Sequence, residues 1–381
     1  MGSWMKVKLA QVCSSISDGD HLPPPKCESG IPFVTISDIK NNKFDLSNTR
    51  FVPKAYFDTI DAKRRIRKGD VLYSVVGSYG IPVYADKDLD IAFQRHIAIL
   101  KPRSTIDSRF LYYSMLNPAF YSSADNVAIG AAQKTITLSA LRNLEIPLPP
   151  LPVQRRIADV LSAYDDLIEN NRRRIAILEE TARLTYRKWF GGANTARTAT
   201  LGEIAEIVMG QSPESKTYNA NGEGLPFHQG VTGFGFRYPQ NEMWCTVGTR
   251  HAEEGDILFS VRAPVGRINV ALERIVIGRG LAAMRAKNNC QSWLLYTLKH
   301  HFSKEDMIGV GCIFASTTKK ELFSVEVPYP STDEIVAFEQ TVSSMDEQVK
   351  TLSKQSAALA AARDMLLPRL MKGDMMRKEN R

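Results

Sequence analysis

The segment Lys68-Gly-Asp-Val-Leu-Tyr-Ser-Val75 returns, with conservative changes, as Glu254-Gly-Asp-Ile-Leu-Phe-Ser-Val261, 186 residues further along the chain. A second pair keeps the same order, because Leu141-Arg-Asn-Leu-Glu-Ile-Pro-Leu-Pro149 matches Leu322-Phe-Ser-Val-Glu-Val-Pro-Tyr-Pro330 at an offset of 181. Ordered matches at such long offsets indicate one long unit present twice, and they argue against a short-period solenoid. The 381-residue chain is therefore expected to repeat one architecture.

Both copies have a β-rich texture. The runs Val71–Val76 and Ile257–Val261 are β-branched or aromatic, and a Gly-Asp turn signal introduces each of them. Gly, Pro, Asn and Ser punctuate the rest of each copy, as in Asn219–Gly224 and Gly230–Tyr238. Each copy therefore reads as a mixed, mostly-β domain with few long helices. Arg95 falls opposite Arg279 in this alignment once small gaps are allowed.

Each copy ends in a long helical pattern. Apolar residues recur at alternating spacings of four and three after the proline-rich stretch Pro147–Pro152, which predicts a coiled-coil seam. Trp189 is expected to continue the first seam, and Pro368 is expected to end the second helix. The alternative is that each helix docks separately on its own domain. The seam residues expected to pair the helices are Ile157, Leu161, Tyr164, Ile168, Ile175 and Leu178 in the first, and Phe338, Val342, Met345, Val349, Leu352 and Leu359 in the second.

The expected fold class is α+β, with two mixed, mostly-β domains joined by two long helices that form an antiparallel coiled coil. An approximate two-fold axis would relate the repeated halves. The first expected helix has 39 residues, from 152 to 190, so at ~1.5 Å per residue it runs roughly 58 Å. Domains held that far apart would touch duplex DNA one to two helical turns from each other. The expected segments are a first domain at 1–151, a helix at 152–191, a second domain at 192–330 and a second helix at 331–376.

Positive charge is unevenly distributed. The 49 Lys and Arg residues exceed the 41 Asp and Glu residues, for a net charge of +8, which permits nucleic acid as a partner. The excess lies mainly in 1–151, where the run Lys63–Lys68 has one apolar residue among basic ones. This run is read as a loop that follows DNA phosphates. The alternative is a strand edge kept soluble by its charge.

The composition limits the class of protein. With 44% hydrophobic and 24% charged residues, the chain has the composition of a globular protein. Its five cysteines are scattered without a CxxC pair, which suits a reducing cytoplasm and gives no zinc site. The N-terminus lacks the apolar core of a signal peptide, and no apolar stretch is long enough to span a bilayer. A cytoplasmic location is expected, without contact with a membrane.

Catalytic motifs are missing from the sequence. It contains no GxxxxGK[ST], HExxH or GxSxG pattern, and the adjacent His300-His301 would diverge too far to share a metal ion. The stretch Asn117-Pro118-Ala119-Phe120 resembles the amine-gripping loop of amino-methyltransferases, but its second proline is absent and no glycine-rich cofactor loop precedes it. We therefore expect no catalytic residue, no metal site and no cofactor on this chain, and a self-sufficient enzyme is disfavoured.

Over nearly its whole length the chain resembles the specificity (S) subunits of type I restriction–modification systems. The resemblance rests on Lys68–Gly77, on Glu254–Gly266, on Gly130-Ala-Ala-Gln-Lys134 and on the helix entry Pro149–Ile157. The second copy departs from the pattern, because Ala315-Ser316 stands where the first copy has Gln133-Lys134. Base-reading roles at Gln133 and Lys134 therefore do not transfer to the second copy.

The resemblance implies a two-part reader of double-stranded DNA. Each target-recognition domain would read one half of a split, asymmetric site, and the coiled coil would fix the gap between the halves. Two methyltransferase (M) subunits would dock along the helices, with restriction (R) subunits where the system has them. Adenine methylation and ATP-dependent cleavage would belong to those subunits, which would bind S-adenosylmethionine, ATP and Mg²⁺.

Residue type and loop context give candidate DNA contacts, since Arg, Gln, Asn and His reach base edges. A coiled-coil scaffold whose β-rich domains bind protein is the alternative, and it would show no salt-dependent affinity for DNA. The candidates for the first half-site are Lys63, Arg64, Arg65, Arg67, Lys68, Ser78, Tyr79, Gln94, Arg95, His96, Gln133 and Lys134. Those for the second are Ser212, Tyr218, His228, Arg250, Arg262, Arg267, Arg279 and Lys319.

Overall fold

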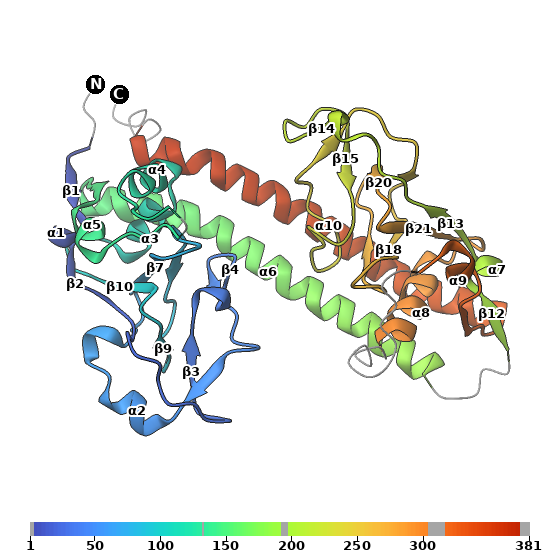
Figure 1. Cartoon of the computed structure of the whole chain (residues 1–381), viewed down its shortest axis with the longest axis horizontal. Coiled ribbons are helices and arrows are strands. Elements are labelled where there is room, and N and C mark those ends of the chain that lie inside the picture. Colours follow the sequence, from blue (N-terminus) through green and yellow to red (C-terminus); the bar gives the residue numbers. More distant parts are fainter. Residues whose placement is uncertain (1–3, 132, 192–196, 304–316, 374–381) are drawn as a thin grey trace. The chain divides into compact units, whose positions relative to one another are not determined.

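The computed structural model describes residues 4–131, 133–191, 197–303 and 317–373. The chain divides into two compact units, Met1–Glu169 with Ser356–Arg381, and Asn170–Gln355. Two long helices, α6 (Leu151–Phe190) and α10 (Thr332–Lys372), each contribute to both units (Figure 1). The unit boundary therefore falls within the helices, whereas the segments expected from the sequence divide at the helix ends. Of those expected ends, 192 and 376 lie outside the described residues.

The first unit is built on a four-stranded antiparallel sheet in the order β2-β10-β7-β8. Along β7, Val71 and Tyr73 enter the core beside the long helices, whereas Leu72 enters a second core on the opposite face. Successive side chains of a strand point to opposite faces, so this sheet is buried on both sides. That explains why β7 is a continuous apolar run. The strands are β2 (Cys13–Asp18), β10 (Ile97–Pro102), β7 (Val71–Ser74) and β8 (Pro82–Tyr84).

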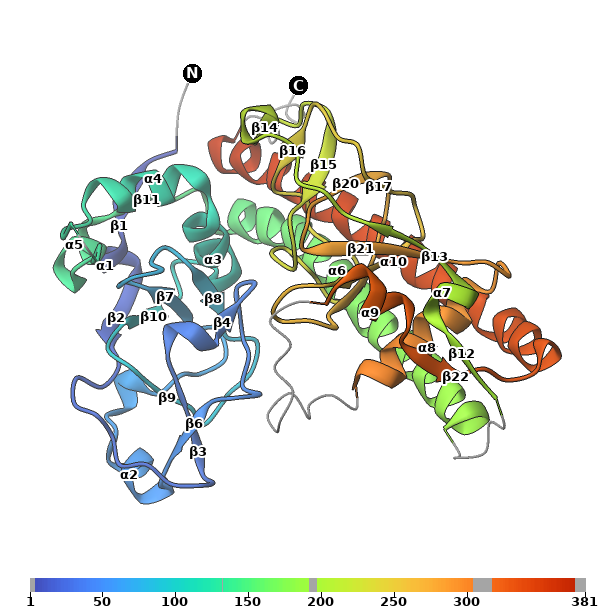
Figure 2. The ribbon, with the colours of Figure 1, turned by 45° about the vertical axis from the view of Figure 1, so that its right-hand side comes forward.

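The second unit repeats this sheet in the order β13-β21-β18-β19, of which Figure 2 labels β13 and β21. Ile257 and Phe259 of β18 enter one core and Leu258 enters the other, as their counterparts do in the first unit. The predicted duplication is therefore confirmed at the level of strand order and facing. The strands are β13 (Ala205–Met209), β21 (Leu281–Ala286), β18 (Ile257–Ser260) and β19 (Ile268–Val270).

Smaller sheets also occur in matching pairs. An antiparallel pair, β1–β11 or β12–β22, joins the start of each copy to the segment just before its long helix. A parallel pair, β3–β9 or β15–β20, flanks each central sheet. The first-unit strands are β1 (Lys6–Lys8), β11 (Glu145–Pro147), β3 (Ile31–Val34), β9 (Ala92–Phe93), β6 (Arg50–Val52), β4 (Ile39–Lys40) and β5 (Lys43–Phe44). The second-unit strands are β12 (Thr198–Thr200), β22 (Glu326–Pro328), β15 (Leu225–His228), β20 (Ile275–Ile277), β14 (Tyr218–Asn219), β16 (Trp244–Cys245) and β17 (His251–Ala252).

Short helices complete both units, and several begin at a side chain that caps the first turn. Thr137 accepts a hydrogen bond from the Ala140 amide at the start of α5, and Thr318 does the same for Glu321 at the start of α9. Such caps satisfy amide groups that have no partner within the helix. The short helices are α1 (Leu9–Val12), α2 (Lys54–Thr59), α3 (Ser108–Leu116), α4 (Pro118–Asn126), α5 (Leu138–Asn143), α7 (Leu201–Ile204), α8 (Gln291–Ser303) and α9 (Lys319–Phe323).

The two long helices run antiparallel within each unit. In the first unit, Leu161 of α6 shares a core with Leu367 and Leu370 of α10. In the second unit, Ile175 clusters with Val349 and Leu352, while the Phe190 ring lies 5.5 Å from that of Phe338. Ile157 and Val342 are fully buried, and Leu178 and Met345 pack against the second-unit clusters. The remaining predicted seam residues, Tyr164, Ile168 and Leu359, are half-buried.

Two expectations for the helices are wrong. The first is wrong only in part, because Trp189 contacts Phe338 of α10, with ring centroids 5.9 Å apart, but is 42% exposed, and Phe190 is the buried residue. A straight α-helix drifts by about 20° per heptad from a strict seven-residue repeat, so after four heptads the buried stripe shifts by one residue. Pro368 also does not end the second helix, because α10 continues to Lys372. Leu370 and Met371 are buried in the first-unit core, and this packing compensates for the hydrogen bond that proline cannot donate.

Candidate nucleic-acid interface

Three loops of the first unit meet where β2 and β7 end and β10 begins. The Val75 amide donates to the His96 carbonyl at 2.8 Å, which joins the loop after β7 to the loop before β10. The Ile136 amide in turn donates to the Val75 carbonyl at 2.8 Å, and the Gly77 amide to the Lys134 carbonyl at 3.1 Å. We call this end of the sheet the first edge. It gathers the predicted contacts Ser78, Tyr79, Gln94, Arg95, His96, Gln133 and Lys134.

A glycine lets the loops of the first edge approach each other closely. A Cβ atom on Gly19 would lie 2.1 Å from the carbonyl oxygen of Phe93, so no other residue fits without moving the backbone. The next residue, Asp20, donates its amide to Phe93 at 2.7 Å and accepts the Arg95 amide at 3.0 Å. These bonds fix the turn that carries Gln94 and Arg95, whose side chain is exposed.

An aromatic and ionic cluster lies beside this turn. The Tyr79 ring stacks on Tyr121 with centroids 5.9 Å apart, and its hydroxyl donates to Asp125. The Lys134 ammonium also binds Asp125, at 2.6 Å. The hydrogen bond to Asp125 and partial desolvation raise the pKa of Tyr79 to about 12. Hydrogen bonds from Lys134 and Tyr79 lower the pKa of Asp125, so the carboxylate is ionised at neutral pH and holds Lys134 in place.

The predicted basic run is partly used within the protein. Arg64 reaches Asp18 at 3.9 Å and Asp20 at 3.5 Å, which places it at the first edge. Arg65 donates to the carbonyls of Ile60 and Asp58 and lies over the Phe57 ring. Lys63 forms an ion pair with Asp61 at 3.3 Å. Arg67 and Lys68 are exposed near the start of β7, at the opposite end of that strand. The run therefore does not form one continuous phosphate-binding loop.

A cavity of about 340 Å³ opens beside the first edge. Arg95 and His96 line one side, and Lys26 and Arg50 bring further positive charge that the sequence reasoning missed. These two residues stand apart from any basic run, so only their position in the fold connects them with Arg95. Burial and the charge of Arg95 lower the pKa of His96, which is therefore neutral at neutral pH.

The second unit forms the equivalent second edge, where β13 and β18 end and β21 begins. The Val261 amide donates to Gly280 at 2.9 Å, and the Thr317 amide to Val261 at 2.8 Å, which matches the two bonds of Val75 in the first unit. These bonds place Arg279 at the position in the second unit that Arg95 occupies in the first, as the sequence alignment predicted. Gly210 repeats the close approach of Gly19, with a Cβ position 2.2 Å from the Gly278 carbonyl oxygen.

Polar side chains gather at the second edge as well. The Ser212 hydroxyl and the Gln229 amide hydrogen bond at 2.8–2.9 Å, and the Arg279 backbone amide lies 3.3 Å from the same hydroxyl. Gln229 was not among the predicted contacts, although it directly follows His228. Arg262 and Arg267 are exposed on the loop after β18, where the Arg267 amide donates to Ser260 at 2.8 Å.

The remaining second-half candidates occupy different settings. Arg250 is exposed, and its carbonyl accepts the Ile277 amide at 3.0 Å, which places it at the end of β20. Lys319 lies over the Phe323 ring on α9. Tyr218 donates to the Pro213 carbonyl and packs against Phe227. His228 is 4% exposed and bonds Asn241, and burial lowers its pKa. Tyr218 and His228 thus make contacts inside the second unit and support the second edge.

The described residues were also searched for a metal site, a methyltransferase loop and a membrane-spanning helix. Among them, no group of three or more His, Cys, Asp or Glu side chains could hold a metal ion. The Asn117 side chain accepts the Ala119 amide and caps α4, so the methyltransferase-like stretch is a helix start. None of the described helices has the length and hydrophobicity needed to cross a membrane.

The duplicated edges agree with a family match that covers most of the chain. The family model described as "Type I restriction modification DNA specificity domain" matches residues 1–180 and again 195–359. The chain belongs to the type I restriction–modification specificity subunits. This confirms the predicted family, its DNA-recognition role and its non-catalytic character. The mixed α+β fold with an internal repeat is confirmed as well.

Related specificity subunits span nearly the same length. A Methanocaldococcus jannaschii protein assigned as the type I restriction enzyme MjaX specificity subunit is 29% identical over 97% of this chain and 93% of its own. The MjaIX specificity subunit of the same organism is 22% identical over 92% of this chain and 88% of its own. The crystal structure of the S subunit from M. genitalium, 21% identical, covers 96% of each chain with a TM-score of 0.61 and shares the fold.

Proposed function

We propose that this specificity subunit reads a bipartite, asymmetric DNA site, with the first edge reading one half and the second edge the other. The observation that carries the proposal is the repetition of the edge. The same pair of backbone hydrogen bonds holds Val75 in the first unit and Val261 in the second, and each edge presents an exposed arginine at the equivalent turn, Arg95 or Arg279.

The two edges differ in their side chains, which supports an asymmetric site. The first presents Tyr79, Gln94 and a Lys134 held by Asp125. The second presents Ser212 and Gln229 hydrogen bonded to each other. Because each base pair offers its own set of donors and acceptors in the major groove, different side chains select different bases.

The chemistry of the system is assigned to partner subunits. We propose that two methyltransferase subunits dock along α6 and α10, and that restriction subunits join them where the system has them. S-adenosylmethionine, ATP and Mg²⁺ would be bound by those partners, in the cytoplasm. Such a partner would also take the target adenine out of the duplex, since the reacting atom is out of reach within the stack.

The test expresses this chain with the methyltransferase subunit of its own system, in cells that lack other adenine methylation, and maps methylated adenines by sequencing. The expected result is one motif with two fixed parts separated by a gap of fixed length and free sequence. Expression of the chain alone is expected to give no methylation. A short contiguous motif, or methylation by the chain alone, would contradict the proposal.

A further inference from the structure

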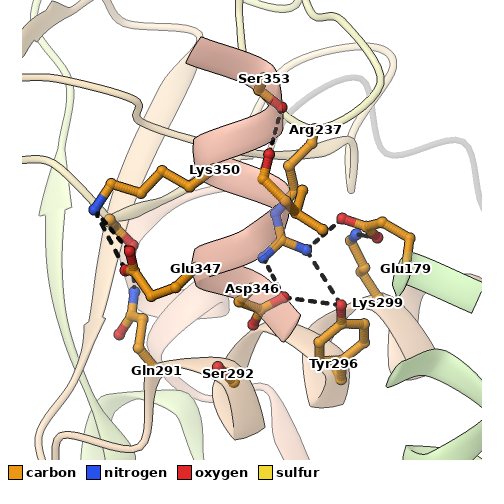
Figure 3. A network of polar contacts seen from close by, with 12 residues as sticks. Glu179, Arg237, Gln291, Ser292, Tyr296, Lys299, Asp346, Glu347, Lys350 and Ser353 are labelled. Atoms are coloured by element: carbon orange, nitrogen blue, oxygen red, sulfur yellow. Dashed lines mark hydrogen bonds and ion pairs between the residues drawn. The ribbon is translucent and has the colours of Figure 1, made fainter. Parts of the chain in front are cut away.

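A buried network of charged side chains joins the second recognition region to both long helices. Arg237, on the loop between β15 and β16, is 5% exposed and contacts Glu179 of α6 at 2.5 Å and Asp346 of α10 at 2.8 Å (Figure 3). Lys299 of α8 binds Glu179 at 2.7 Å, and the Tyr296 hydroxyl lies 3.1 Å from Asp346. Two cations thus face two carboxylates, so the charges of the network balance.

The balance of charge decides the ionisation of the network. Burial alone would raise the pKa of Glu179, but the nearby charges of Arg237 and Lys299 outweigh it and lower that pKa. Glu179 is therefore a carboxylate at neutral pH, and it requires its cations. Loss of one partner from a buried ion pair leaves an uncompensated charge, which is far more costly than replacement of the whole set by neutral groups.

The first unit carries a related cluster in which the arginine comes from a different element. Tyr113 of α3 donates to Asp165 of α6 at 2.6 Å, as Tyr296 of α8 does to Asp346 of α10. The offset between Asp165 and Asp346 is 181, which equals the offset of one of the sequence repeats. In the first unit, however, the arginine is Arg363 of α10, which contacts Asp165 at 2.5 Å. The helices thus supply their own cation in the first unit, whereas the recognition region supplies it in the second.

The loop that carries Arg237 also leads to the second edge. It leaves β15 at Gln229, whose carbonyl accepts the Gly280 amide at 3.0 Å and whose side chain bonds Ser212. Between β15 and β16 the loop folds back on itself, because the Gln240 amide donates to the Gly233 carbonyl at 2.8 Å. The Arg237 carbonyl accepts the Val270 amide of β19 at 2.9 Å, which ties the loop to the central sheet.

We propose that Arg237 is a positioning residue for the second half-site: through its loop it holds Gln229, and with it the second edge, in one orientation on the helix pair. This inference rests on the proposed reading of one half-site by each edge. Without the Arg237 contacts, the second edge would adopt several orientations on the helices. Base discrimination would then fall in the second half-site, whereas base discrimination in the first half-site would stay unchanged.

The test uses the complex with its methyltransferase subunit and the methylation map described above. Arg237→Met alone leaves two buried carboxylates with Lys299 as their cation, so it is paired with the charge-neutral double variant Arg237→Met, Asp346→Asn, which removes one cation and one carboxylate and keeps the Lys299–Glu179 pair. Arg237→Lys is the conservative variant, since an ammonium keeps the charge but lacks the two-pronged geometry that spans both carboxylates. The matched control is Arg363→Lys, which makes the same change in the first-unit network.

The expected result is selective. In the double variant, methylation at sites with a wrong base in one half of the motif rises by roughly tenfold, comparable to the removal of one good base-reading side chain. The other half stays as strict as in the wild type. Arg237→Lys is expected to give a smaller rise in the same half, and Arg363→Lys no rise in that half.

Three outcomes would overturn the inference. The first is unchanged strictness in both halves for the double variant and for Arg237→Lys. The second is equal loosening of both halves. The third is complete loss of methylation in the double variant while Arg237→Lys reads both halves as strictly as the wild type. A wild-type complex that yields no split motif would instead refute the proposed function, so the two failures are distinguishable.

Discussion

Leu161→Ala tests whether the helix pair forms part of the first unit's core. Leu161 is fully buried on α6, in a core that includes Leu367 and Leu370 of α10. Truncation of a buried leucine costs about 2–5 kcal/mol, because apolar burial is reduced and a cavity is left behind. A domain of 150–250 residues loses roughly 2–4 °C of melting temperature per kcal/mol, so a cost near 3 kcal/mol lowers the melting temperature by about 6–12 °C.

The neighbouring residue provides the control. Val160 precedes Leu161 on the same helix but is 40% exposed, so Val160→Ala is expected to change stability by no more than about 0.5 kcal/mol. Differential scanning calorimetry of both variants gives the comparison, because the first-unit transition shifts in one and not in the other. Adding Leu367→Ala to Leu161→Ala is expected to cost less than the sum of the single changes, with a coupling of about 0.5 kcal/mol or more.

Two results would refute this reasoning. If the melting temperature of the Leu161→Ala variant lies within about 2 °C of that of the Val160→Ala variant, α6 contributes little to the first-unit core. Strict additivity of Leu161→Ala and Leu367→Ala would mean that α6 and α10 do not pack together there.

Three further predictions concern DNA binding and pH. Arg64→Ala, at the first edge, is expected to weaken binding to every sequence and to lower the salt slope by about 0.9 for the DNA phosphate that the variant no longer neutralises. The measurement is fluorescence anisotropy at several salt concentrations, and an unchanged slope favours a strand edge kept soluble by charge. Arg262→Ala is expected to relax base preference in the second half-site by roughly 5- to 150-fold in competition binding, whereas a uniform weakening on all sequences contradicts a base contact. The pKa of His228 is lowered from 6.5 by burial, so below pH 6.5 the unfolded chain binds this proton before the folded one does. Urea unfolding of the second unit should therefore show stability falling as the pH drops below 6.5, and His228→Gln should flatten that dependence; an equal slope in the variant assigns it to another group.

Much of the fold followed from local pattern. The repeat at Lys68 and Glu254 marks β7 and β18, because a strand buried on both faces needs the same short apolar run in both copies. The heptad located both helices and most of the residues by which they pack on each other. At Trp189 the heptad was only partly right, since that ring contacts Phe338 but helical drift leaves Phe190 as the buried residue. The helix end expected at Pro368 was wrong, because tertiary packing carries the helix to Lys372.

The site was harder to predict, because side-chain setting depends on distant residues. His228 has the chemistry of a base reader, yet β15 places it inside the sheet, and the exposed residue is the next one, Gln229. Arg237 gave no signal of its role, since its partners Glu179 and Asp346 lie 58 and 109 residues away in the sequence. Arg95 and Arg279 were paired correctly because the repeat aligns the turns that carry them.

The central claim is that each edge reads its own half of one site, and a pair of methylation maps tests it directly. One map is made with Gln133→Ala and Lys134→Ala in the first edge, and the other with Arg279→Ala in the second. The account predicts that the first pair of changes loosens base preference in one half of the motif, and that Arg279→Ala loosens it in the other half only. Loosening of the same half by both sets of changes would contradict the assignment of one half-site to each edge.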